Sequence, residues 1–233
     1  MKKLINAVLG VCVLAMLFIC VRSITDQQDF NAEIVERENA VKARLIEIRL
    51  AQNAYKDQNE CFCDNWDTLI AWVKVAKLPT IIKQGVLTEA QMEKGMTEAK
   101  AAAIVARGDA AEIAANGLQE FRRDTTWVSL IDSLYGEDFN ADELCYVPYS
   151  DAVDNEKKKF DLLATVGKTR SEELIPVMEC GAEFEVYLSG ESKLWAREAA
   201  NKREIAEGMG NYPGLKIGIA SGTQWNNNAG NWE

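Results

Sequence analysis

Cysteine is the reactive residue whose spacing in this sequence is most informative. Two cysteines stand one residue apart, Cys61 and Cys63, and two more lie far along the chain, Cys145 and Cys180. An even number of cysteines in an exported domain predicts two disulfides. A ring closed between Cys61 and Cys63 would be strained, so we expect each to pair with Cys145 or Cys180. Buried free thiols and a four-thiolate zinc site are the alternatives, although the C-x-x-C spacing of zinc knuckles is missing.

Other catalytic motifs are absent or incomplete. The chain has no histidine, which excludes Ser-His-Asp and Cys-His catalysis and histidine-based zinc sites. Residues 167–169 resemble the end of a phosphate-binding loop, but Leu162 replaces its upstream glycine. The first part of a calcium-binding loop is matched by the spacing of Asp138, Asn140 and Asp142. The turn glycine and the closing carboxylate of such a loop are missing. We therefore expect a non-enzymatic protein with no cofactor and no metal.

An apolar segment near the N-terminus gives the strongest indication of location. Residues 4–21 contain no charged side chain, and their number is at the lower limit for crossing a bilayer as a helix. Lys2 and Lys3 precede the segment, so the positive-inside rule keeps the N-terminus in the cytoplasm. We expect one transmembrane anchor in the inner membrane and a periplasmic head.

Two other interpretations of this segment remain open. A secretory signal peptide would be cleaved near Ser23. A lipoprotein would be modified at Cys12 or Cys20, although Val11 and Ile19 stand where a small residue normally precedes the cysteine. All three interpretations place the rest of the chain outside the cytoplasm.

An amphipathic stalk helix is predicted directly after the anchor. No proline or glycine interrupts residues 11–59, and apolar side chains recur at helical spacing. Such a stripe needs a partner, because an isolated helix is only marginally stable in water. The partner is either the protein's own head or, in an assembly, another copy or another envelope protein. The predicted interaction face consists of Phe30, Ile34, Val41, Leu45 and Ile48.

Short motifs after the stalk carry a family resemblance. The run Ala51-Gln52-Asn53-Ala54-Tyr55-Lys56, a cysteine-rich turn and Trp66-Asp67-Thr68-Leu69-Ile70 resemble the layout of type IV pilins and type II secretion pseudopilins. The Gly/Phe processing site of those proteins, and the glutamate at the fifth position of their apolar run, are missing here. Residues 44–56, 65–74 and 226–233 are similar to uncharacterised single-pass bacterial envelope proteins. The resemblance implies a membrane-bound protein and no particular activity.

The remaining patterns predict an α+β fold, with the long N-terminal transmembrane and amphipathic helix followed by a helical region and a small antiparallel sheet. We expect an anchor and stalk over residues 1–57, a head over 58–222 and a polar tail over 223–233. Helices are predicted from Trp66 to Leu78, within 88–117 and over 194–207. Alternating or short apolar runs predict strands at 144–149, 160–166, 182–188 and 217–220.

Charge and the tail complete the functional hypothesis. The net charge of −10 argues against binding nucleic acid, whose phosphates would repel the chain. Trp225 and Trp232 stand in the polar tail and are candidates for contact with a partner. The favoured function is assembly or scaffolding by an anchored envelope protein. A periplasmic ligand-binding module is the alternative, and a carboxylate-dependent hydrolase is a third hypothesis.

Overall fold

The computed structural model describes residues 2–136, 138–168, 171–219 and 229–233, without the side chains of residues 2–8, 11, 81, 83 and 124. The elements form two compact units. The larger unit contains Met1–Ile70 and Asn140–Glu233, and the smaller one contains Ala71–Phe139. The predicted head, residues 58–222, is therefore divided between them. The fold is α+β, with a long N-terminal helix and small antiparallel sheets, as the sequence predicts.

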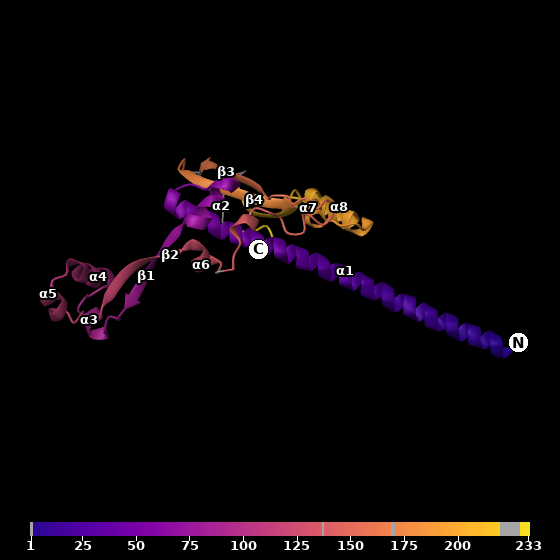
Figure 1. Ribbon diagram of the computed structural model, residues 1–233, viewed down its shortest axis with the longest axis horizontal. Helices are drawn as coiled ribbons and strands as arrows, with labels where there is room; N and C mark the ends of the chain where they lie inside the picture. Colours follow the sequence, from indigo (N-terminus) through magenta and orange to yellow (C-terminus); the bar gives the residue numbers. More distant parts are fainter. Residues whose placement is uncertain (1, 137, 169–170, 220–228) are drawn as a thin grey trace. The chain divides into compact units, whose positions relative to one another are not determined.

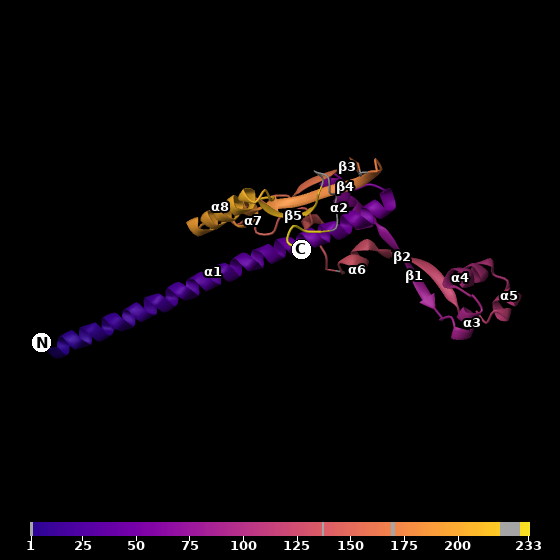
Figure 2. The same ribbon diagram turned by 180° about the vertical axis from the view of Figure 1, so that it is seen from behind.

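Helix α1 (Lys2–Asn59) is the longest element of the larger unit. Its 58 residues correspond to roughly 87 Å at 1.5 Å per residue. The absence of proline and glycine after Gly10 explains why it continues without a break. It ends where Glu60 adopts a left-handed backbone conformation, φ 62°. Figures 1 and 2 show the N-terminal half of α1 extending beyond the elements that cover its C-terminal half.

The C-terminal half of α1 packs against the protein's own head. It contacts strand β5 (Gly214–Gly218) and the short helix α7 (Phe184–Tyr187). Four residues of the predicted interaction face are buried, and Phe30 is half-buried with its ring 4.7 Å from that of Trp195. Of the two partners left open for this face, the structure shows the protein's own head, which covers Ile34, Val41, Leu45 and Ile48.

A reciprocal pair of hydrogen bonds fixes the turn that follows α1. The fully buried Gln52 side chain donates from Nε2 to the Cys63 carbonyl (2.8 Å) and accepts at Oε1 from the Cys63 amide (3.0 Å). A buried amide side chain is stable only when its polar atoms are paired, and here the partner is one backbone residue. Gln52 thus directs the chain back along the helix.

The sheet of the larger unit has the order β3-β4-β5, and all its pairs are antiparallel. Strand β3 is Asp161–Lys168 and β4 is Leu174–Glu183. Helix α8 (Lys193–Gly208) follows, and the Ser192 hydroxyl caps it by accepting from the Leu194 amide. The predicted strand at 160–166 and helix at 194–207 are confirmed within a few residues. The strand predicted at 217–220 overlaps β5, which begins at Gly214 and ends at Gly218.

Two predicted strands in this unit are wrong. Residues 144–149 form turns after the 3₁₀ helix η1 (Ala141–Glu143), with only an isolated bridge from Tyr146 to Lys159. Of the strand predicted at 182–188, only residues 182 and 183 are extended, as the end of β4. Helix α7 begins at the next residue, Phe184. Tyr187 and Leu188 are buried one helical turn beyond Phe184, and this spacing of three and four is helical.

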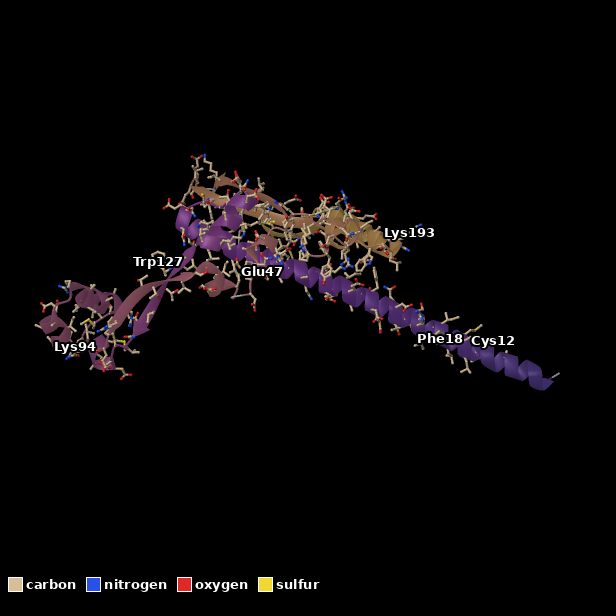
Figure 3. The ribbon with its side chains drawn as sticks, viewed as in Figure 1. Cys12, Phe18, Glu47, Lys94, Trp127 and Lys193 are labelled. Carbon is tan, nitrogen blue, oxygen red and sulfur yellow. The ribbon has the colours of Figure 1, made fainter. Side chains whose placement is uncertain are left out.

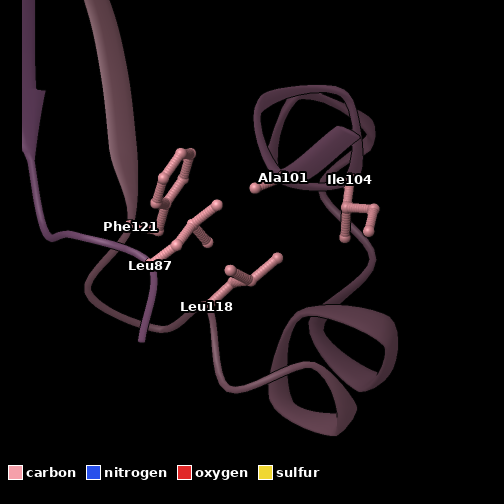
Figure 4. Close-up of a cluster of buried hydrophobic side chains, with 5 residues drawn as sticks. All are labelled: Leu87, Ala101, Ile104, Leu118 and Phe121. Carbon is pink, nitrogen blue, oxygen red and sulfur yellow. The ribbon is translucent and has the colours of Figure 1, made fainter. Parts of the chain in front are cut away.

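The smaller unit is a β-ribbon with a helical tip. Strand β1 (Lys77–Gln84) pairs antiparallel with β2 (Arg122–Ser129), and the sequence analysis missed both strands. The tip holds α3 (Glu89–Glu93), α4 (Glu98–Arg107) and α5 (Ala110–Ala115). These confirm the predicted helices within 88–117. Figure 4 shows their core, which consists of Leu87, Ala101, Ile104, Leu118 and Phe121.

Two helices adjoin the ribbon. Helix α6 (Leu130–Leu134) follows β2 directly. Helix α2 (Trp66–Val75) precedes β1 and ends three residues before the predicted position, because Leu78 and Pro79 belong to the strand. Pro79 lies opposite Trp127, in a two-stranded ribbon whose strands both lie at an edge, a position that tolerates proline.

Matched valines test whether the head covers α1. Val41 is fully buried, whereas Val35 on the same helix is 55% exposed. Val41→Ala should lower the free energy of unfolding by about 1.5–3 kcal/mol, because the cavity adds to the lost burial. Val35→Ala should change it by about 0.5 kcal/mol or less. Denaturant unfolding of the full chain in mild detergent measures both, and equal effects would contradict the packing described above.

Candidate functional site

The N-terminal half of α1 exposes apolar side chains in every direction. Leu17, Phe18 and Ile19 are consecutive, so they point about 100° apart around the helix, and all three are more than half exposed. Figure 3 shows Phe18 and Cys12 on this part of the helix, away from the sheet. The other exposed large apolar residues between residues 9 and 24 are Leu9, Val13, Leu14, Met16, Val21 and Ile24.

This distribution differs from that of an amphipathic surface helix. A helix that is apolar all round requires an apolar environment, either a protein core or a membrane. We call residues 9–21 the apolar segment. No helix in the described part of the chain is both long and apolar enough to span a membrane. The predicted anchor begins at Leu4, so part of it lies among the residues whose side chains are not described.

Charged and polar groups mark the end of the apolar segment. Arg22 and Asp26 form an exposed ion pair of 3.7 Å along the helix. Both residues line a groove of about 350 Å³ together with Phe18, Ile19 and Leu194. Leu194 lies at the start of α8 and is 57% exposed. The first turn of α8 therefore lies at the level of α1 where apolar side chains give way to charges.

A buried arginine holds α1 to the head. Arg37 is 7% exposed, and its Nη1 donates to the carbonyls of Ser189 (2.6 Å) and Tyr187 (3.3 Å). Its Nη2 pairs with Glu33 at 2.8 Å. The guanidinium carbon lies 3.8 Å from the centre of the Trp195 ring, a cation–π contact. The predicted interaction face of the stalk does not include this residue.

The same arginine connects to the turn region before β3. The Tyr149 ring centre lies 5.1 Å from the guanidinium, and the Tyr149 hydroxyl donates to Glu36 Oε1 at 3.2 Å. Burial and the neighbouring Glu36 carboxylate raise the pKa of Tyr149. The phenol therefore stays protonated and remains a donor at neutral pH. One face of α1 thus binds segments from three parts of the larger unit.

All six cysteines are free thiols in the structure. The expected disulfides joining Cys61 or Cys63 to Cys145 or Cys180 are therefore not present. Cys61 is exposed and the other three are buried. Cys180 lies on β4 between Leu162 of β3 and Ile217 of β5, and burial raises the pKa of its thiol. In the described residues no group of three or more Cys, Asp or Glu side chains is placed to hold a metal ion.

The end of the chain is attached to β5. Gly230 bridges to Ile217, and the Asn231 side chain accepts from the Lys216 amide and donates to the Gly214 carbonyl. Glu233 pairs with Arg49 of α1 at 3.1 Å. The described part of the predicted polar tail is therefore held against β5 and α1. Trp232 is half-buried among them, and Trp225 lies outside the described residues.

Comparison of the chain with protein-family models, with curated proteins and with solved structures gave no match. The resemblance to pilins and envelope proteins therefore rests on the sequence motifs alone. The apolar segment is the candidate functional site because its exposure is explained by no contact within the described chain.

Thiol accessibility tests the arrangement of the cysteines. Cys61 should react rapidly with a maleimide in the folded chain, because it is exposed and unpaired. Cys180 should react only after unfolding, because it is fully buried and its thiol stays protonated. Mass spectrometry of labelled peptides, without reducing agent, measures both rates. A Cys61 that resists labelling until reduction would show a disulfide and contradict the structure.

Proposed function

We propose that this protein is a single-pass envelope protein that acts non-enzymatically in assembly or scaffolding, in the layout of a pilin or pseudopilin. The first part of α1, residues 4–21, anchors it in the inner membrane. Lys2 and Lys3 keep the N-terminus in the cytoplasm and direct the head to the periplasm. One observation carries the proposal: the apolar segment exposes large side chains around its whole circumference.

Energetics favour an apolar environment for this segment. Each large aliphatic or aromatic side chain removed from water contributes roughly 1.5–3 kcal/mol. Leu14, Phe18 and Val21 are all more than 60% exposed in the isolated chain, so most of this contribution is still to be gained. The exposed Leu194 at the start of α8 then lies at the membrane surface, beside the Arg22–Asp26 pair.

The burial of the C-terminal half of α1 defines where assembly takes place. The face formed by Val41, Leu45 and Ile48 is occupied by the head, so it offers no surface to another protein. The apolar segment is not covered by the described chain. Within a bilayer its side chains are free to pack against the same segment of another copy. We therefore propose the membrane segment, and not the stalk face, as the surface through which copies assemble.

The native cysteines of the apolar segment test both parts of the proposal. Cys12 and Cys20 are exposed on α1. In membranes they should resist a charged thiol reagent, since the bilayer excludes it, whereas Cys61 should react. The protein should remain in the pellet after alkaline extraction. Oxidation with a membrane-permeable catalyst should join copies through Cys12 or Cys20, and Cys12→Ser with Cys20→Ser should abolish the cross-linked dimer.

Cys61→Ser is the matched control and should leave the dimer unchanged. Release of the protein by alkaline extraction would contradict the anchor. A protein that stays in the membrane but never cross-links at either position would contradict assembly through this segment.

A further inference from the structure

A cavity of about 770 Å³ lies in the larger unit, on the side of α1 that faces the end of α8. Glu38 and Lys42 of α1 form one wall, and the C-terminal turns of α8 form the opposite wall. Strand β5 and residues 229–232 complete it. Its volume lies within the range of small-molecule sites in proteins. None of the described residues of the anchoring segment lines it, so it is separate from the proposed anchor.

Among the described residues, the charges around the cavity leave one cation without a partner. Lys202 pairs with Glu38 at 2.9 Å, and Lys216 pairs with Glu179 at 3.1 Å. Lys42 is half-buried, and no described residue forms a hydrogen bond or an ion pair with its ammonium group. An ammonium group without a partner is available to an anion, and a charge-assisted hydrogen bond would hold a carboxylate at this position.

Apolar surface surrounds this charge. Ile205 is 59% exposed and Met209 is 72% exposed, and both line the cavity from the last turns of α8. Phe184 and Leu215 line it from the sheet side. The half-buried Trp232 adds an indole ring from the C-terminal segment. Exposed apolar side chains that converge on a cavity are typical of ligand sites.

An unpaired polar group lies near two residues that line the cavity. The Tyr187 hydroxyl is fully buried and has no hydrogen-bond partner in the described structure. Burial raises its pKa, and the Glu38 carboxylate raises it further, so the hydroxyl stays a protonated donor. Glu38 and Tyr212 both line the cavity. Buried unpaired hydroxyls are rare in folded proteins.

We propose that this cavity binds a small amphipathic monoanion, of the class of a medium-chain carboxylate. The carboxylate pairs with Lys42, and the alkyl chain lies on Ile205, Met209 and Trp232. A ligand with two or more negative charges fits less well, because Lys202 and Lys216 are already neutralised and Glu38 would repel the second charge. The proposal does not depend on the anchor, since the binding groups all belong to the head.

Isothermal titration of the full chain in lipid nanodiscs, with octanoate as the probe, tests the proposal. Empty nanodiscs give the heat of partitioning into lipid. Octanoate should bind at least tenfold more tightly than octanol, and acetate should not bind detectably. Lys42→Gln should weaken octanoate binding by about tenfold or more, because a hydrogen bond to a charged group is lost. Met209→Ser, at an exposed position, should weaken it several-fold.

Lys193→Gln is the matched control. Lys193 is exposed at the opposite end of α8, does not line the cavity and has no partner in the described structure. Its substitution should leave octanoate binding unchanged. Equal affinity of the original chain and the Lys42→Gln variant would overturn the proposal, as would binding of octanol as tight as that of octanoate. If the protein proves to be soluble, the same titration can be done in buffer. Octanoate binding is therefore tested even if the proposed membrane anchor is wrong.

Discussion

The buried guanidinium of Arg37 is the interaction on which the arrangement of the larger unit depends. A buried arginine is stable where its charge is paired and most of its donors find partners. Both Nη atoms of Arg37 do so, whereas its Nε has no partner in the described structure. Here the partners come from the connection between α7 and α8, from Trp195 of α8 and from Glu33 one turn away. Each hydrogen bond that involves a charged group contributes about 1.5–3 kcal/mol. The position of α8 along α1 is therefore set by polar contacts, which have one geometry, as well as by apolar burial, which tolerates sliding.

This fixed contact divides α1 into two parts with different surroundings. From Ile34 to Ala54 the helix presents one buried face, and its apolar side chains are inside the head. From Leu9 to Ile24 it presents apolar side chains on all sides, and the described chain covers none of them fully. Because the helix is continuous, the environment of the first part determines the orientation of the head. A membrane around the apolar segment would hold the first turn of α8 at its surface and the cavity beside Lys42 in the aqueous compartment.

Elements that bury one face could be predicted from the sequence, because a buried face requires apolar residues at regular spacing. The long helix, α8 and strand β3 follow from spacing and from the absence of proline and glycine. Strands β1 and β2 were missed because a two-stranded ribbon with exposed faces has no buried side, hence no alternation. Their Thr and Ile content was the only available signal. The strand predicted at 182–188 was wrong for the opposite reason. Alternation over only a few residues, here as far as Tyr187 and Leu188, also fits a helical turn.

The candidate sites were less predictable than the elements. The exposure of the large apolar side chains described in the apolar segment follows directly from their composition. The roles of Arg37 and Lys42 depend on segments in the last third of the chain, and no local pattern distinguishes these two residues from the other charged residues of the stalk. The cysteines illustrate a further limit, because an even count and an exported location do not determine which thiols come within bonding distance.

Hydrogen exchange along α1, measured on the full chain in lipid nanodiscs, tests the two-part helix most directly. Two separate segments should exchange slowly, residues 9–21 because the bilayer excludes water, and residues 34–54 because the head covers them. The exposed residues between them, 23–29, should exchange faster, since only the helix itself protects their amides. Exchange at 9–21 as fast as at 23–29 would show that the apolar segment lies in water and would contradict the account.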